Sequence, residues 1–224
     1  MSGNAPEIPL PAPAGPWQRG LEGLRSWRRA LAGPRRLAHQ IATGAPLKIV
    51  VGSGGISPPG WLETDVEYLN LLRPQDWRRF FQPGSIAALL AEHVWEHLTW
   101  DDGLAAARTC HEYLRPGGYL RLAVPDGFHP DPAYREWVRV GGSGPGAGDH
   151  KVLYTHETLG KLLTAAGFAV EPLEYFYAAG VFHETAWNPD DGMIHRSRRY
   201  DERNRDGQPH YTSLIVDARK VGTR

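Results

Sequence analysis

One short stretch constrains the fold more than any other: an apolar run that ends in a cluster of glycines. The run Lys48 to Val51 is followed directly by Gly52-Ser53-Gly54-Gly55. A short run rich in β-branched residues and closed by glycines is typical of a buried parallel strand. Because glycine has no β-carbon, a ligand can approach the backbone closely there. The stretch therefore predicts an α/β fold with a nucleotide-binding edge after this strand.

The residues that follow narrow the class of nucleotide. A dinucleotide or phosphate site needs a helix that opens from the glycine loop, or a longer loop that ends in lysine. Residues 56–60 instead contain two adjacent prolines, which disfavour a full helix. The next apolar run, Trp61 to Val66, reads as a second strand and carries Asp65 near its end, where a carboxylate can accept both hydroxyls of a ribose. A glycine loop and a ribose acid without a phosphate cradle fit S-adenosylmethionine.

Four later motifs follow in order: Ala91 to Leu98, Tyr113 to Gly118, Val124 to Gly127 and Leu162 to Phe168. Together with the glycine loop they resemble the class I S-adenosylmethionine-dependent methyltransferases, more narrowly a small bacterial branch with a shortened glycine loop followed by Pro-Gly-Trp. The resemblance covers residues 47–224. It implies an α/β, Rossmann-like fold with a seven-stranded, mostly parallel sheet and helices on both faces. The last strand, residues 211–220, would run antiparallel between the fifth and sixth strands.

The resemblance also implies S-adenosyl-L-methionine as the cofactor and a set of residues that bind it. These are Gly52, Ser53, Gly54, Gly55, Asp65 and Glu92. The chain departs from the family pattern at Val50, where the family has an acid that bonds the methionine amino group. A second departure lies in residues 68–83, which offer no clear third strand.

The segment His93 to His97 spells His-x-x-Glu-His, an arrangement that one group of zinc proteases uses on a helix. Here the apolar strand 86–91 runs directly into the motif, so we expect no helix under both histidines and no metal. At the end of a parallel strand, Glu92 and His93 would instead line the ligand pocket. Glu96 and His97 would start or pin the next helix. A zinc hydrolase remains the third interpretation.

Acceptor chemistry depends on polar groups near the same edge. A base is needed only if the acceptor is a protonated oxygen or nitrogen, and the candidates are His93 and His150. The long loop 128–149 leaves from this edge, and we expect it to cover the acceptor with its glycine run 141–148 as a hinge. The candidate substrate residues are Asp126, His129, Tyr134 and Lys151. The charge-dense excursion 178–210 is either solvated or a second wall of the site.

Composition bounds the class of protein and its partners. A chain of 224 residues with 41% hydrophobic content suits one α/β domain. We predict a flexible tail (1–16), a basic amphipathic helical extension (17–46) and a methyltransferase domain (47–224). The extension either packs on the domain edge or contacts an acidic lipid surface or an acidic partner. The 25 basic and 25 acidic residues cancel, which argues against a nucleic-acid partner.

The remaining expectations concern location and function. The single cysteine, Cys110, excludes an internal disulfide, and no apolar run has the length of a membrane span or signal core, so we expect a cytoplasmic protein. The predicted function is methyl transfer to a small polar or glycan-like acceptor. The alternative is a non-catalytic binding or docking module with the same fold, which Val50 and the missing third strand favour. The sequence leaves the oligomeric state open.

Overall fold

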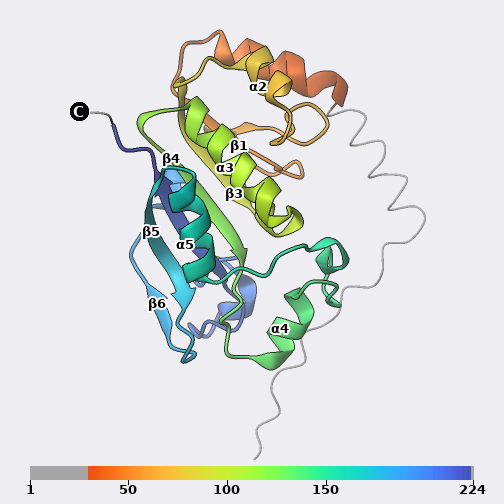
Figure 1. The fold of residues 1–224 in the computed structure, drawn as a ribbon, viewed down its shortest axis with the longest axis vertical. Helices are drawn as coiled ribbons and strands as arrows, with labels where there is room; N and C mark the ends of the chain where they lie inside the picture. Colours follow the sequence, from red (N-terminus) through yellow and green to blue (C-terminus); the bar gives the residue numbers. More distant parts are fainter. Residues whose placement is uncertain (1–29, 223–224) are drawn as a thin grey trace, which may run out of the picture.

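The structure is a computed structural model, and it describes residues 30–222. The predicted tail and residues 17–29 of the predicted extension lie outside the described residues. Seven strands form one sheet in the order β2-β1-β3-β4-β7-β5-β6 (Figure 1). The strands are β1 (Leu47–Val50), β2 (Leu62–Glu63), β3 (Ile86–Glu92), β4 (Leu114–Pro125), β5 (Ala169–Phe176), β6 (Phe182–Glu184) and β7 (Ser213–Arg219).

The strand directions match the expected Rossmann-like arrangement. β1 pairs in parallel with β2 and β3, and β3 pairs in parallel with β4. β7 lies between β4 and β5 and is antiparallel to both. This confirms the predicted mostly parallel sheet with the last strand antiparallel. The parallel strands β1 and β3 end at one edge of the sheet, where the glycine loop and His93 follow them.

Three features of the sheet differ from the family pattern or from the predicted strands. Between β2 and β3 the described chain forms no third strand, but the helix α2 (Pro74–Phe80), which begins at a proline and buries Trp77. The seventh strand is instead β6, a three-residue edge strand in the charged excursion that its sequence did not reveal. The predicted second strand, residues 61–66, is also reduced to Leu62–Glu63.

Helices α3 (Trp100–Tyr113) and α5 (His156–Ala165) lie side by side on one face of the sheet (Figure 1). They bury Cys110 and Leu162 in the main core, which α2 joins through Trp77. The N-cap residues Thr99 and Thr155 each accept a hydrogen bond from a backbone amide of the first turn. The helix α4 (Pro132–Val138) lies apart from this layer, at the lower end of the molecule in Figure 1.

An extended segment, and no α-helix of the described chain, contributes to the core on the opposite face. There Ile194 and the neighbouring Trp187 pack against a second apolar cluster that includes Val50, Leu90 and Ile215. The prediction of helices on both faces therefore holds for one face. The physical reason lies in the glycine loop, because its adjacent prolines prevent the helix that would otherwise follow β1.

The buried ion pair of Arg121 and Asp217 fastens this extended segment to the sheet. The guanidinium donates to both carboxylate oxygens, at 2.7 and 3.0 Å. Its Nη1 also donates to the carbonyl oxygens of Asn188 and Gly192, at 3.1 and 2.9 Å. One side chain thus joins β4, β7 and the excursion.

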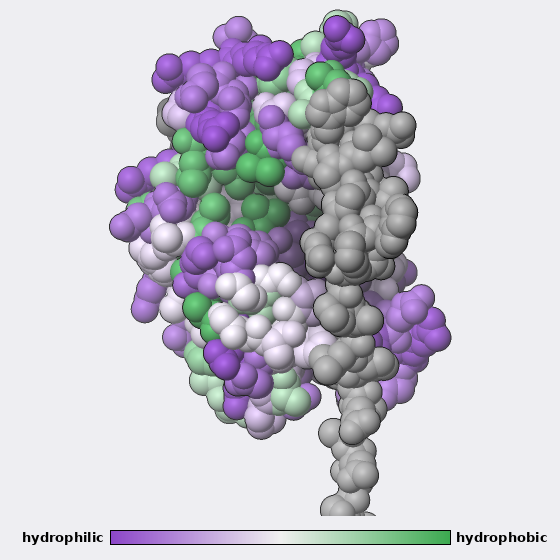
Figure 2. Space-filling model, turned by 90° about the vertical axis from the view of Figure 1, so that its right-hand side faces the viewer, coloured by the Kyte–Doolittle hydropathy of each residue, from purple (hydrophilic) through white to green (hydrophobic). Residues whose placement is uncertain are grey.

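Residues 30–41 form a helix that continues through Gly33 and Pro34. Leu37 is buried in the main core, and a β-carbon at Gly33 would lie 2.4 Å from the ring of Tyr68. The helix therefore packs closely on the domain, while Arg35 and Arg36 are exposed. Within residues 30–222, no helix is long and apolar enough to cross a bilayer. Figure 2 shows one side of the molecule, where apolar side chains gather between two hydrophilic regions.

Candidate functional site

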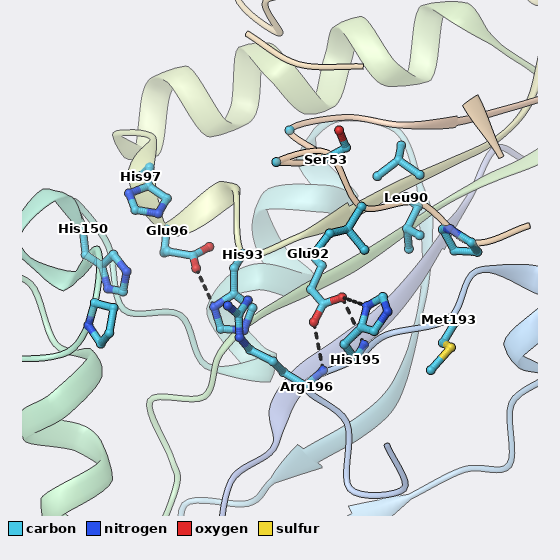
Figure 3. Close-up of a pocket in the computed structure, with 16 residues that line it drawn as sticks. Ser53, Leu90, Glu92, His93, Glu96, His97, His150, Met193, His195 and Arg196 are labelled. Carbon is cyan, nitrogen blue, oxygen red and sulfur yellow. Dashed lines mark hydrogen bonds and ion pairs between the residues drawn. The ribbon is translucent and has the colours of Figure 1, made fainter. Parts of the chain in front are cut away.

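A cavity of about 490 Å³ opens at the edge of the sheet where β1 and β3 end. Four segments line it: the glycine loop, the end of β3 with the 3-10 turn η1 (Trp95–His97), the loop before α5, and the excursion between β6 and β7. Figure 3 shows Glu92 and His195 together in one part of the cavity, and Glu96, His97 and His150 in another. The lining residues thus come from parts of the chain that are distant in sequence.

The amides of the glycine loop donate hydrogen bonds to Ser53 within the loop and to Asp65 outside it. Gly52, Gly54 and Gly55 have φ angles of 64°, 58° and 89°, which side chains rarely allow. The Gly54 amide donates to Asp65 Oδ2 at 3.0 Å, and the Gly55 amide donates to Ser53 Oγ at 3.1 Å. These two amides are therefore not available to cradle a phosphate. This geometry agrees with the expectation that pyrophosphate is disfavoured.

The structure brings four of the six predicted cofactor residues to the cavity. Gly52, Ser53, Gly54 and Glu92 line it. The other two, Gly55 and Asp65, do not belong to its lining.

The two acids in this set hold other parts of the site in place. The Asp65 carboxylate accepts hydrogen bonds from the amides of Gly54 and Val66, so it fixes the loop. Glu92 accepts from the amides of His195 and Arg196, at 3.1 and 2.9 Å, and so fixes the opposite wall. Binding of the ribose by Asp65 stays a prediction.

His93 occupies an unusual backbone position at the end of β3. Its φ of 56° is the one positive value at a non-glycine position among residues 30–222. Its Nδ1 lies 3.0 Å from Glu96 Oε1, and its Nε2 lies 2.9 Å from Ser213 Oγ. Burial alone would raise the pKa of Glu96, but the neighbouring imidazoles of His93 and His97 hold it below the ordinary value. The ring of His93 is thus held from both sides.

A second cavity of about 240 Å³ adjoins the first. Four residues line both cavities: His93, Pro145, His150 and Arg196. The walls of the smaller cavity also include Trp137, Val138, Arg203 and Tyr211. The structure therefore places both candidate bases, His93 and His150, where the two cavities meet.

The four predicted substrate residues line neither cavity. Asp126, His129 and Tyr134 are 0%, 2% and 0% exposed. The Asp126 carboxylate accepts from the amides of Phe128 and Phe176, and the ring of Tyr134 stacks on His129 with centroids 3.9 Å apart. These three side chains are thus buried, and their contacts hold the loop in place.

The fourth predicted substrate residue, Lys151, lies on the surface. Its ammonium group contacts Asp149 at 2.7 Å. Two charged side chains this exposed contribute little to stability. Lys151 is therefore brought to neither cavity by the fold.

The glycine run 141–148 is packed against the helix before it. The amides of Gly142 and Gly144 donate to the carbonyl oxygens of Arg139 and Trp137, both at 2.8 Å. A β-carbon at Gly144 would lie 2.6 Å from the Trp137 side chain. Pro145 of this run lines both cavities, so the loop does reach the site. Its action as a hinge stays a prediction.

No protein-family model and no curated protein matches the chain. Solved structures do resemble it. A protein of Thermotoga maritima, described as an S-adenosylmethionine-dependent methyltransferase and possible histamine N-methyltransferase, is 14% identical over 90% of this chain and 97% of its own, with a TM-score of 0.47. The 1,6-didemethyltoxoflavin-N1-methyltransferase of Burkholderia thailandensis is 15% identical over 99% of both chains, with a TM-score of 0.43. An Archaeoglobus fulgidus methyltransferase is 13% identical over 90% and 96%, with a TM-score of 0.44.

All three are methyltransferases. At such low identities and TM-scores the likeness identifies neither an acceptor nor an activity for this chain.

The candidate site also contains residues that the sequence did not single out. Met193, His195 and Arg196 form one wall of the larger cavity. They lie in the charge-dense excursion, which has neither helical nor strand periodicity. The excursion leads from the edge strand β6 into β7, which pairs with β4. This connection was the one sign that it could reach the site.

Proposed function

We propose that this chain transfers the methyl group of S-adenosylmethionine to a small polar acceptor. The observation that carries the proposal is the pair of adjoining cavities, which share His93, Pro145, His150 and Arg196. The larger cavity, beside the glycine loop, would hold the donor, and the smaller one would hold the acceptor. The sulfonium already activates the methyl group, so the protein mainly has to align the two molecules and exclude water.

The larger cavity suits this donor in shape and chemistry. Its volume falls within the range of small-molecule sites. Apolar side chains of Val50, Ile56, Leu90 and Met193 offer contacts for an adenine ring. S-adenosylmethionine carries no phosphate, which is consistent with a glycine loop that uses its own amides internally.

The smaller cavity favours an acceptor with an apolar body and a polar group. Trp137 and Tyr211 supply aromatic surface. Arg203 is already paired with Asp201, at 2.6 Å, whereas Arg196 forms no ion pair with any described residue. A guanidinium without a carboxylate partner suits an acceptor that carries an acidic or hydroxyl group. A glycan-like acceptor belongs to this class.

His93 is the candidate base whose environment is most defined. If the acceptor loses a proton from oxygen or nitrogen, replacing His93 by glutamine should lower kcat by roughly 10²- to 10⁴-fold. The affinity for S-adenosylmethionine should change little, because the base acts on the acceptor. Turnover would be measured with any acceptor found in a panel of small polar compounds. An unchanged kcat would remove His93 from this role and leave His150.

A matched pair of glycine variants tests where the donor binds. Gly54 lines the cavity and has open space around its α-carbon, so Gly54→Val would place a branched side chain where the ligand lies. We expect the affinity for S-adenosylmethionine, measured by titration calorimetry, to fall by at least about tenfold, which corresponds to about 1.4 kcal/mol. Gly55→Val is the control. Gly55 also has a positive φ and open space, but it does not line the cavity.

The comparison separates a ligand clash from backbone strain. Both variants place a branched residue at a positive φ and so carry a similar strain. Equal losses of affinity would mean that strain explains the effect. Absence of binding heat for the unaltered protein would contradict the proposed function itself.

One observation favours the alternative, a non-catalytic binding module. Val50 lines the cavity, so the position that has an acid in the family supplies no carboxylate to hold the methionine amino group. Binding of S-adenosylmethionine without methyl transfer to any compound of an acceptor panel would support this alternative. Methyl transfer to any acceptor would exclude it.

A further inference from the structure

Three potential metal ligands gather at one end of the larger cavity. The carboxylate of Glu96 and the imidazoles of His97 and His150 have ligand atoms that all lie within 4.8 Å of one another. All three residues line the cavity, and Figure 3 shows them grouped beside His93. Glu96 and His97 belong to the turn η1, whereas His150 comes from the loop before α5.

Glu96 has an incomplete set of partners. Its side chain is 1% exposed. Oε1 lies 3.0 Å from His93 Nδ1 as an ion-pair contact, but neither Oε1 nor Oε2 accepts a well-aligned hydrogen bond from any residue in the described part of the chain. A buried carboxylate oxygen without a partner is costly, and a bound cation would remove that cost.

Both imidazoles are oriented as metal ligands commonly are. His150 Nδ1 donates to the carbonyl oxygen of Val138 at 2.7 Å. His97 Nδ1 lies 3.5 Å from the carboxylate of Asp149. An oxygen that holds Nδ1 fixes the ring and leaves the lone pair of Nε2 for an ion.

We propose that Glu96, His97 and His150 bind one divalent transition-metal ion of the zinc type. Two imidazoles and one carboxylate form a ligand set that zinc favours, whereas Mg²⁺ and Ca²⁺ prefer oxygen ligands. Tetrahedral bonds of about 2.0–2.1 Å would place the ligand atoms about 3.4 Å from one another. The two imidazoles and the carboxylate must therefore move slightly closer together when the ion binds. The side chain of His97 is 33% exposed and has room to turn.

This site departs from the expectation of no metal and also from the zinc-protease interpretation. In that interpretation His93 and His97 would be the ligands and Glu96 the base. In the proposed site Glu96 is a ligand, and His150 takes the place of His93. The fold therefore assembles a ligand set that the local His-x-x-Glu-His pattern does not describe.

Three protein ligands leave one coordination position open, and here it would face the cavity. An oxygen or nitrogen atom of the acceptor could occupy it. With the ion bound, His150 is a ligand, and His93 remains as the candidate base. The metal site itself does not depend on the binding of S-adenosylmethionine.

Titration with cobalt tests the proposal directly. Untagged protein would be stripped with a chelator, dialysed and titrated with Co²⁺, whose visible absorption reports a four-coordinate site. We expect one equivalent of Co²⁺ to bind, one equivalent of Zn²⁺ to displace it, and Mg²⁺ to have no effect. His97→Gln and His150→Gln should each weaken Co²⁺ binding by at least about 100-fold, since even the loss of an outer partner costs 10- to 100-fold.

The control is His195→Gln. His195 lines the same cavity, but its imidazole contacts Glu92 at 3.2 Å and it is not one of the three ligands. This variant should keep the Co²⁺ affinity of the unaltered protein. Circular dichroism would confirm that each variant is folded. Because His97 is partly exposed, we expect His97→Gln to disturb the fold least.

Two outcomes would overturn the proposal: no stoichiometric Co²⁺ absorption in the folded protein, or an equal loss in His195→Gln and His97→Gln. Calorimetry with S-adenosylmethionine on the same metal-free sample separates this test from the proposed function. Cofactor binding without metal binding would refute the metal site alone. Metal binding without cofactor binding would refute the donor assignment alone.

Discussion

Replacing Arg121 by methionine is expected to lower the free energy of unfolding by about 3–5 kcal/mol. Arg121 and Asp217 are both buried, and their side chains share two hydrogen bonds. Methionine fills a similar volume but leaves the Asp217 carboxylate without this partner. The remaining contact, Arg219 Nη2 at 3.2 Å, comes from a half-exposed side chain and compensates little. Urea denaturation followed by circular dichroism would measure the loss.

The same substitution should also weaken binding in the larger cavity. Arg121 Nη1 holds the carbonyl oxygen of Gly192, and the next residue, Met193, lines the cavity wall. The double variant Arg121→Met/Asp217→Leu separates the two effects. Replacing both buried charges by apolar side chains is often neutral for stability. We therefore expect it to recover stability but not the affinity for S-adenosylmethionine.

Either of two results would contradict this account. A loss of stability below about 1 kcal/mol in Arg121→Met, the size typical of an exposed pair, would mean that the ion pair is not isolated from water. Full recovery of ligand affinity in the double variant would mean that the wall does not depend on Arg121.

A second large effect is expected from two buried groups whose contributions to pH dependence oppose each other. Burial raises the pKa of Asp126 to about 6, although the amides of Phe176 and Phe128 donate to its carboxylate. Burial lowers the pKa of His129 to about 4. Between these values the folded chain keeps Asp126 protonated and His129 neutral, whereas the unfolded chain has the reverse arrangement. Both states then bind the same number of protons at these two sites.

The sign of each contribution follows from the proton count. The stability from Asp126 is complete below pH 3.8 and is lost as the pH rises to about 6. The stability from His129 is complete above pH 6.5 and is lost as the pH falls to about 4. From pH 4 to 6 the two slopes nearly cancel in the unaltered protein.

Removing one of the two groups should reveal the pH dependence that the other contributes to the free energy of unfolding. Relative to the unaltered protein, the stability of Asp126→Asn should rise from pH 4 to 6, and that of His129→Phe should fall, each by about 3 kcal/mol. Urea denaturation at several pH values measures both. Curves parallel to that of the unaltered protein would show that neither group changes its protonation on folding.

Features encoded by neighbouring residues could be predicted from the sequence. The first strand and its glycine loop were expected from local spacing. Helical spacing also marks α3 and α5, and Thr155 is a residue type that commonly caps a helix. The edge at which the ligand cavity lies followed from the direction of parallel strands.

Features that depend on distant contacts could not be predicted in this way. Asp126 and Tyr134 look like polar groups of an active-site loop, but packing under α4 and against β5 buries them. Glu92 has the position of a cofactor ligand, yet the excursion supplies partners for both of its oxygens. The grouping of His150 with Glu96 depends on a loop whose path no periodic pattern describes.

The place of β7 within the sheet has a consequence for the order in which a growing chain can assemble. β5 reaches β4 only through β7, and the excursion that walls the cavity is held by Arg121 of β4, whose guanidinium is itself held by Asp217 of β7. On the ribosome, β1, β3 and β4 can pair as they emerge, but the cavity stays open on one side. A ligand bound in the cavity could therefore stabilise the folding chain only after β7 has left the exit tunnel, and earlier intermediates have only their own core contacts.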